Sequence, residues 1–203
     1  MDDAKPPSYL KPYLDAARRH AGGFKSLLWA NPGTQAKRFD AFARLCDFNG
    51  KSILDAGCGR ADFLDFLLAR GIKPDHYVGL EAVKDLATAA ERKHHPRCTI
   101  LRADFVREPA RLLVGAEVVI FSGSLNTMET PTFQATLRTA YEAAGRELVF
   151  NYLCSPSLAG ARYLTWHPAN TVMRYARTLC EDVRQLEDYI PGDCTISMRK
   201  MVR

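Results

Sequence analysis

The stretch that decides the fold is residues 53–63, ILDAGCGRADF. Its first four residues fit a buried strand, Gly57 and Gly59 fit a tight turn, and a helical pattern of apolar residues begins at Phe63. Glycine suits such a turn because it adopts positive φ without strain and lets a ligand approach the backbone. The helix that follows would offer unpaired N–H groups to an anionic group. The stretch therefore predicts a strand, a ligand-binding loop and a helix in succession.

Length and composition favour one globular domain. The chain has 203 residues, of which 47% are hydrophobic and 25% charged, as in ordinary soluble proteins. The net charge is +5, but basic and acidic residues are interspersed, which favours a solvated surface over a nucleic-acid interface. No apolar run is long enough to cross a bilayer, and the start MDDAKPP is unlike a signal peptide. Six cysteines without a C-x-x-C pair predict neither a metal site nor a disulfide framework, so we expect a cytoplasmic protein with reduced thiols.

Strand and helix patterns alternate from residue 51 onward, which predicts a mostly parallel sheet with helices on both faces. Strands are expected at 52–56, 77–80, 98–101, 117–121 and 147–153. Two more patterns, at 183–190 and 194–198, predict an antiparallel hairpin closed by a turn at 191–193. Residues 1–50 read as helical. We therefore expect an α/β protein with a seven-stranded, doubly wound sheet.

The glycine motif resembles the first signature of the class I S-adenosylmethionine (SAM)-dependent methyltransferases, Asp-x-Gly-x-Gly-x-Gly. Asp55, Gly57 and Gly59 match it, and Ala61 stands in place of the third glycine. The dinucleotide-binding pattern Gly-x-Gly-x-x-Gly fits less well because Asp62 occupies its last position. A nearby acid also suits the cationic groups of SAM better than a pyrophosphate. The resemblance implies a SAM-binding, Rossmann-like domain at 51–203 and an N-terminal helical lid at 1–50.

Acids also follow the next two predicted strands. Glu81 lies 22 residues after Gly59, near the spacing at which nucleotide-binding α/β folds place an acid on ribose hydroxyls. The resemblance assigns Glu81 the same role, and gives Asp104 the adenine amino group and Phe105 the ring face. The alternatives are a surface glutamate, a capping aspartate and a core phenylalanine. The expected cofactor-binding residues are Arg38, Asp55, Gly57, Cys58, Gly59, Glu81, Ala82, Asp104, Phe105, Ser122 and Gly123.

Within that set, Arg38 is a candidate for the carboxylate of SAM because a guanidinium matches two oxygens. A solvated helix arginine is as good an interpretation. Ser122 and Gly123 are candidates to offer backbone carbonyls to the ammonium group of SAM. Cys154 is expected to be an inert, buried thiol.

The sequence indicates less clearly which residues contact the molecule that accepts the methyl group, and no catalytic residue can be assigned. Asn126 and His167 are weak candidates, with a turn residue and a helix cap as the alternatives. The residues that could contact a substrate are Trp29, Asn126, Tyr163 and Trp166.

The sequence predicts a methyltransferase that moves the methyl group of SAM to a small molecule by in-line displacement and releases S-adenosylhomocysteine (SAH). A monomer or homodimer without nucleic-acid or membrane partners is expected. Three alternatives stay open: a non-catalytic SAM-binding accessory or sensor protein, a methyltransferase of RNA or protein, and a nucleotide-dependent oxidoreductase. The Asn/Asp-Pro-Pro-Tyr/Phe and Pro-Cys motifs of DNA, glutamine and RNA cytosine-5 methyltransferases are missing after the fourth strand.

Overall fold

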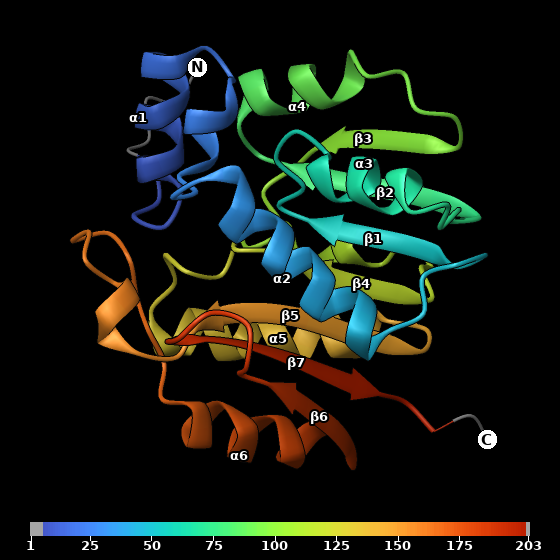
Figure 1. Ribbon diagram of the computed structural model, residues 1–203, viewed down its shortest axis with the longest axis vertical. Helices are drawn as coiled ribbons and strands as arrows, with labels where there is room; N and C mark the ends of the chain where they lie inside the picture. Colours follow the sequence, from blue (N-terminus) through green and yellow to red (C-terminus); the bar gives the residue numbers. More distant parts are fainter. Residues whose placement is uncertain (1–5, 202–203) are drawn as a thin grey trace.

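A mixed β-sheet separates two layers of helices in the computed structural model, which describes residues 6–201 (Figure 1). Within these residues, seven strands pair in the order β3-β2-β1-β4-β5-β7-β6. The strands are β1 (Ser52–Ala56), β2 (His76–Glu81), β3 (Cys98–Arg102), β4 (Val118–Phe121), β5 (Glu147–Leu153), β6 (Asp182–Leu186) and β7 (Asp193–Arg199). Strands β1 to β5 are parallel, and β7 is antiparallel to both β5 and β6. The predicted fold class is confirmed.

Start signals in the sequence explain several of the helices. Asn31 accepts a hydrogen bond from the N–H of Thr34 at 2.9 Å, and Pro32 occupies the first turn of α2. The helices are α1 (Lys11–His20), α2 (Pro32–Leu45), α3 (Asp62–Ala69), α4 (Lys84–Glu91), α5 (Thr130–Ala143) and α6 (Ala169–Leu179), with short 3₁₀ turns η1 (Phe24–Leu27), η2 (Pro109–Leu112) and η3 (Pro156–Leu158). Between residues 6 and 201, no helix has the length and hydropathy that a membrane span requires.

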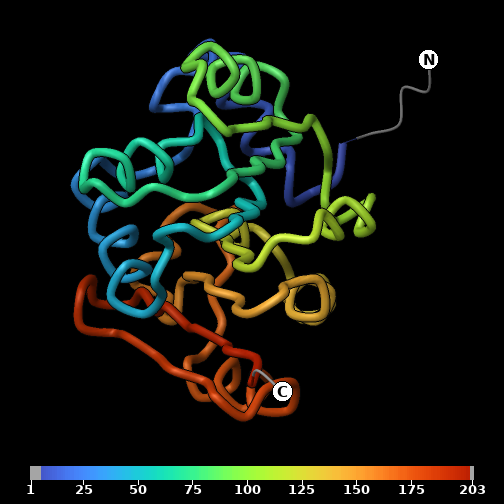
Figure 2. The backbone as a smooth tube through the Cα atoms, turned by 90° about the vertical axis from the view of Figure 1, so that its right-hand side faces the viewer, coloured from blue at the N-terminus to red at the C-terminus, as the bar shows by residue number. Residues whose placement is uncertain are grey.

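Each face of the sheet has its own apolar core because successive strand residues point to opposite sides. On β1, Ile53 packs on one face with Phe42 of α2 and Phe63 of α3. Leu54 packs on the other face, in the cluster that includes Leu137 of α5 and Val172 of α6. Figure 2 shows the two layers from the side, with α2 and α3 (blue to cyan) opposite α5 (gold).

The N-terminal helices have two different surroundings. The apolar side of α2 belongs to the core of the sheet, whereas α1 and η1 lie beside α4 at the edge where the parallel strands end (Figure 1). There Ala17 packs with Val83 and Leu86, and Tyr13 and Leu27 pack against them. Residues 1–5 of the expected lid lie outside the described residues.

The C-terminal hairpin differs from its predicted form. Strand β6 ends at Leu186, four residues before the predicted end, and a longer connection leads to β7. Its residues leave the ladder because their side chains bond elsewhere: Asp188 forms an ion pair with Arg44 of α2 at 2.8 Å, and the Tyr189 hydroxyl donates to Asp193. These contacts tie the connection 187–192 to its surroundings.

Candidate active site

The glycine loop joins β1 to α3 and turns over the end of β2. The N–H groups of Gly57 and Cys58 both donate to the carbonyl of Leu80, at 2.8 and 3.0 Å. Gly57 has a φ of +81°, and a Cβ added there would lie 2.4 Å from the Cβ of Ser124. Glycine is therefore required at this position by both conformation and space.

Ala61, at the position of the third glycine in the signature, has a left-handed conformation. Its φ is +55°, which costs a residue with a side chain about 1–2 kcal/mol. The residue is fully buried in the core beside α3. Helix α3 begins only after it, at Asp62.

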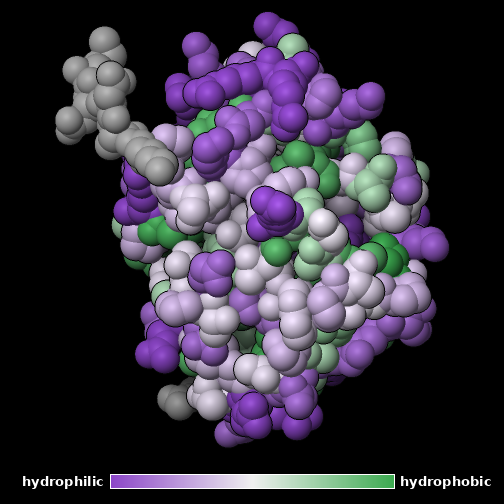
Figure 3. Space-filling model, turned by 90° about the vertical axis from the view of Figure 1, so that its left-hand side faces the viewer, coloured by the Kyte–Doolittle hydropathy of each residue, from purple (hydrophilic) through white to green (hydrophobic). Residues whose placement is uncertain are grey.

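A cavity lies beside this loop at the carboxyl ends of β1 to β4, around the point between β1 and β4 where the strand order reverses. Ligands of open α/β sheets bind at such a reversal. Figure 3 looks onto this edge, where pale, intermediate residues lie between strongly hydrophilic upper and lower ends. One side of the cavity comes from the strand tips and the other from the N-terminal segment: its lining includes Gly57, Gly59, Glu81, Ala82, Asp104, Phe105, Ser122 and Gly123, and also Tyr9, Tyr13, Leu27, Trp29 and Arg38.

Glu81 follows β2 and holds the loop with its carboxylate. One oxygen accepts the N–H of Gly59 at 2.8 Å, and the other accepts the N–H of Val83 at 2.8 Å. Burial raises the pKa of Glu81 to about 7, although these backbone donors act in the opposite direction. Each oxygen has a lone pair left for a ligand in the cavity.

Asp104 follows β3 and also lines the cavity. Its carboxylate accepts the hydroxyl of Tyr9 at 2.9 Å and the N–H of Val106 at 3.0 Å. The next residue, Phe105, packs edge-to-face on Phe121 with ring centroids 5.3 Å apart. Asp104 thus caps the turn that follows it and also lines the cavity, and Phe105 packs in the core and also lines the cavity. The structural and ligand-binding interpretations from the sequence therefore do not exclude one another.

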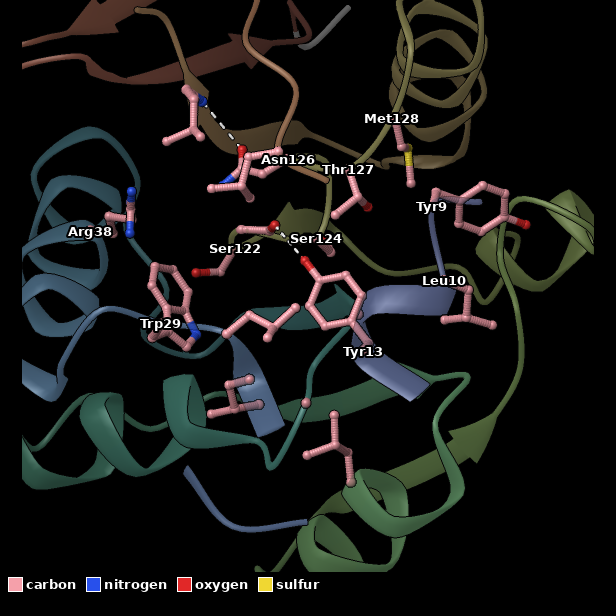
Figure 4. A pocket seen from close by; sticks show the side chains of 18 of the residues that line it. Tyr9, Leu10, Tyr13, Trp29, Arg38, Ser122, Ser124, Asn126, Thr127 and Met128 are labelled. Carbon is pink, nitrogen blue, oxygen red and sulfur yellow. Dashed lines mark hydrogen bonds between the residues drawn. The ribbon is translucent and has the colours of Figure 1, made fainter. Parts of the chain in front are cut away.

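The loop after β4 forms the part of the cavity wall that α1 contacts. The N–H of Gly123 donates to the side chain of Asn151 at 2.8 Å, and its carbonyl accepts the hydroxyl of Tyr13 at 3.2 Å. Ser124 donates to the carbonyl of Ala56 at 2.7 Å. Figure 4 shows Tyr13 and Trp29 on either side of this loop. The Ser122 hydroxyl is buried, with no hydrogen-bond partner in the described part of the chain.

Arg38 of α2 is buried and not solvated. Its side chain, 9% exposed, forms an ion pair with the fully buried Asp193 of β7. Its guanidinium also lies over the ring of Trp29, 4.6 Å from the centroid, and Trp29 in turn covers Gly123. Arg38 therefore lines the cavity with a guanidinium that Asp193 and Trp29 hold from two sides.

Similarity to a protein of known sequence shows the family to which the chain belongs. The sequence matches no protein-family profile. It is 32% identical over 159 residues to a protein of Mycobacterium tuberculosis (strain ATCC 25618 / H37Rv) named "Putative methyltransferase Rv1506c", and the alignment covers 73% of this chain and 93% of the relative. The chain belongs to the class I SAM-dependent methyltransferases.

Solved methyltransferases have the same fold. Magnesium protoporphyrin IX methyltransferase (ChlM) of Synechocystis PCC 6803 with bound SAM superposes with a TM-score of 0.68 at 12% identity, over 98% of this chain and 100% of that one. The complex of DhpI with SAH gives 0.68 at 14% identity, over 97% of both chains. A SAM-dependent methyltransferase of Archaeoglobus fulgidus gives 0.64 at 16% identity, over 82% of this chain and 94% of that one. At these identities the likeness establishes the methyltransferase fold.

Two side chains of the methyltransferase signature do not line the cavity. The side chain of Asp55 lies on the face of the sheet that carries Ile53, because strand residues alternate, and it accepts the hydroxyl of Tyr77. Cys58 is buried, with its sulfur against Gly79. Of the three acids that follow successive strands, only Glu81 and Asp104 face the cavity.

The two catalytic candidates are also engaged elsewhere. His167 is 4% exposed, its ring lies 4.1 Å from that of Phe133, and one ring nitrogen lies 3.2 Å from the carbonyl oxygen of Met128. Burial lowers its pKa, and it is absent from the cavity lining. Asn126 does reach the cavity, but its side-chain oxygen accepts the N–H of Leu153 at 3.2 Å. The described contacts of His167 therefore favour a structural role, and the general-base interpretation stays a prediction.

Tyr163 and Trp166 line a second, more open depression. Both are 40% exposed, and the depression shares Thr127 and Leu164 with the cavity beside the glycine loop. Tyr9 and Tyr13 also line the cavity and were not among the candidates from the sequence; their hydroxyls donate to Asp104 and to the carbonyl of Gly123. Tyr9 lies in the turn before α1 and Tyr13 lies in α1, so no local pattern marks the two as a pair.

Proposed function

We propose that the chain binds SAM in the cavity beside the glycine loop and transfers its methyl group to a small molecule. The observation that carries the proposal is that Glu81 and Asp104, from two strand tips, face one space beside Gly57 and Gly59. The mycobacterial relative, named as a methyltransferase, and the SAM- and SAH-bound structures with the same fold support it.

The residues in the cavity fit the parts of SAM. The free lone pairs of Glu81 suit two ribose hydroxyls, and Asp104 with Phe105 suits the edge and face of adenine. The backbone of Gly57 and Gly59 gives close approach, and Ser122 has a buried hydroxyl in need of a partner. Arg38 and the carbonyls of the loop after β4 suit the carboxylate and ammonium of the methionine end.

We also propose that residues 9–29 act as a lid. Tyr9 binds Asp104, Tyr13 binds Gly123, and Leu27 lies over Gly59, so three points of the cavity are covered by one segment. Such a cover excludes water and fixes the reacting groups.

When bound, SAM supplies a methyl group on a positively charged sulfur, which keeps the electron pair of the broken C–S bond after the acceptor attacks. The chain then needs mainly to hold the two molecules in line and to exclude water. No residue is assigned as a base, since His167 is outside the cavity and Asn126 is tied to Leu153. We place the acceptor toward the second depression, where Tyr163 and Trp166 can stack on a planar molecule.

Titration of SAH by calorimetry tests this proposal. We expect micromolar binding that Glu81→Gln and Asp104→Asn each weaken by about tenfold or more, because the loss of a charged acceptor costs about 1.5–3 kcal/mol. Glu91→Gln, on the exposed end of α4, is the control and should bind SAH like the wild type. Absence of heat with the folded wild-type protein would end the proposal.

The acceptor can be sought with labelled SAM and a cell extract. Label in a small-molecule fraction supports the proposal, and label in RNA or protein favours the alternative substrates. No transfer despite SAH binding favours an accessory or sensor protein. A cytoplasmic location and a monomer or homodimer stay predictions.

A further inference from the structure

Three side chains with metal-binding donor atoms meet beside the ends of β5 and β6. Cys154 follows β5, Glu187 follows β6, and Cys194 lies near the start of β7. Their two sulfur atoms and a carboxylate oxygen all lie within 4.8 Å of one another. No motif in the sequence marks this group, because Cys154 is far from the other two residues in the chain and the cysteines form no C-x-x-C pair.

The register of the sheet produces the cluster. Tyr152 of β5 lies directly opposite Cys194 of β7, and Cys154, two residues further along, points to the same face. The N–H of Cys154 donates to the carbonyl of Gly192 at 2.9 Å, which fixes the end of β5 against the connection 187–192. Cys194 is fully buried, Cys154 is partly buried and Glu187 is exposed. An ion could therefore enter from the side of Glu187.

The donor set suits a borderline-soft cation. Zn²⁺ binds thiolate sulfur at about 2.3 Å and carboxylate oxygen at about 2.0–2.2 Å, so that neighbouring donors of a tetrahedral ion lie about 3.5–3.8 Å apart. Mg²⁺ and Ca²⁺ prefer oxygen ligands alone. A separate observation points to the same place: the hydroxyl of Tyr152, across from Cys194, is buried and has no hydrogen-bond partner among the described residues.

We propose that Cys154, Cys194 and Glu187 bind one Zn²⁺ ion, with the fourth position open to water or to the Tyr152 hydroxyl. The thiols must lose their protons for the ion to bind, so two protons leave for each ion bound.

The position of the cluster in the fold suggests what a bound ion would do. It would join the end of β5 to the connection 187–192, which carries Ile190, a lining residue of the cavity. The next residue, Asp193, holds Arg38 by the buried ion pair. The ion would therefore fix one side of the cavity without touching a ligand inside it.

Titration of the reduced full-length protein with Co²⁺ tests the site, because Co²⁺ bound by thiolates in a tetrahedral site has charge-transfer and visible absorption bands that Zn²⁺ lacks. We expect these bands to saturate at one ion per chain, and Zn²⁺ to abolish them. Cys154→Ser and Cys194→Ala should each remove the bands, and Glu187→Gln should weaken binding by about tenfold or more. Cys98→Ser changes a partly buried cysteine on β3 and should leave the titration unchanged.

The same titration can overturn the proposal. Absence of thiolate bands in the reduced wild type, or bands that persist in Cys154→Ser, would exclude the site. A Cys154–Cys194 disulfide in the isolated protein, with no Co²⁺ binding after reduction, would show a redox pair instead. Because Cys194 is buried, circular dichroism checks the fold of its variant, and the partly exposed Cys154 and Glu187 keep the test decisive if that variant unfolds.

Discussion

Asp55 shows how the burial of a single carboxyl changes its chemistry. It is 2% exposed, and one of its oxygens has no hydrogen-bond partner within the described chain. Burial raises its pKa from 3.8 to about 7, although the bond from Tyr77 acts against the shift. The folded protein therefore binds this proton more tightly than the unfolded chain does.

This raised pKa predicts a pH-dependent loss of stability. The contribution of Asp55 to stability is complete below about pH 4 and is lost as the pH rises through about 7, where the buried group must ionise. Asp55→Asn keeps an acceptor for Tyr77 and cannot ionise. We expect the free energy of unfolding in urea to fall less between pH 5 and pH 8.5 in this variant than in the wild type.

Asp85→Asn, at an exposed position of α4, is the control for the same measurement and should follow the wild type. If Asp55→Asn were less stable than the wild type at pH 8.5, the ionised carboxylate would be a stabilising group and the interpretation would be wrong.

At the scale of elements, the glycine loop makes a prediction with a built-in control. Gly57→Ala adds a Cβ at φ +81° and 2.4 Å from Ser124, whereas Gly50→Ala adds one at φ +66° with nothing within 4 Å. In both variants the left-handed conformation lowers the free energy of unfolding by about 1–2 kcal/mol. Only Gly57→Ala also forces the loop away from Ser124, which should lower the free energy of unfolding by about 1–3 kcal/mol more. Thermal and urea unfolding should rank Gly57→Ala as the less stable variant.

The same pair tests the site. SAH affinity should fall strongly in Gly57→Ala and stay at the wild-type level in Gly50→Ala, which lies far from the cavity lining. Equal stability of the two variants would show that the loop yields to the added methyl group.

The elements could be predicted from the sequence more fully than the site. Apolar runs between turn residues predict both ends of β1 and of β5 correctly, because hydrophobic periodicity is a local property of the sequence. The end of β6 was missed because Asp188 bonds to a residue far away in the chain, Arg44 of α2, which draws the connection out of the ladder. Such contacts depend on the fold and leave no local pattern.

The residues of the site also fall into two groups: those that follow from local sequence patterns and those whose contacts depend on the fold. Gly57, Glu81 and Asp104 follow from the order of strands and loops, and all three reach the cavity. Asp55 belongs to the same motif, but the alternation along β1 sends its side chain to the face under α3. The lid contacts of Tyr9 and Tyr13 could not be predicted, since nothing local says that α1 lies over the ends of β3 and β4.

At the scale of the whole molecule, two ion pairs connect α2 to the C-terminal hairpin. Arg38–Asp193 is buried, with side chains 9% and 0% exposed, and Arg44–Asp188 is exposed, at 48% and 63%. Both join the same helix to the same end of the hairpin. They form a matched comparison of a buried and a solvated pair across the fold.

Double-mutant cycles on these pairs give the last prediction. Arg38→Met or Asp193→Asn leaves a buried partner without its counter-charge, and each should destabilise the protein by about 3 kcal/mol. The double variant should lose less than the sum, with a coupling of about 1 kcal/mol or more. Arg44→Met and Asp188→Asn should couple by less than about 1 kcal/mol, because water screens the exposed pair. Urea unfolding measures both cycles, and equal couplings would show that Arg38 and Asp193 do not act as a buried connection between α2 and the hairpin.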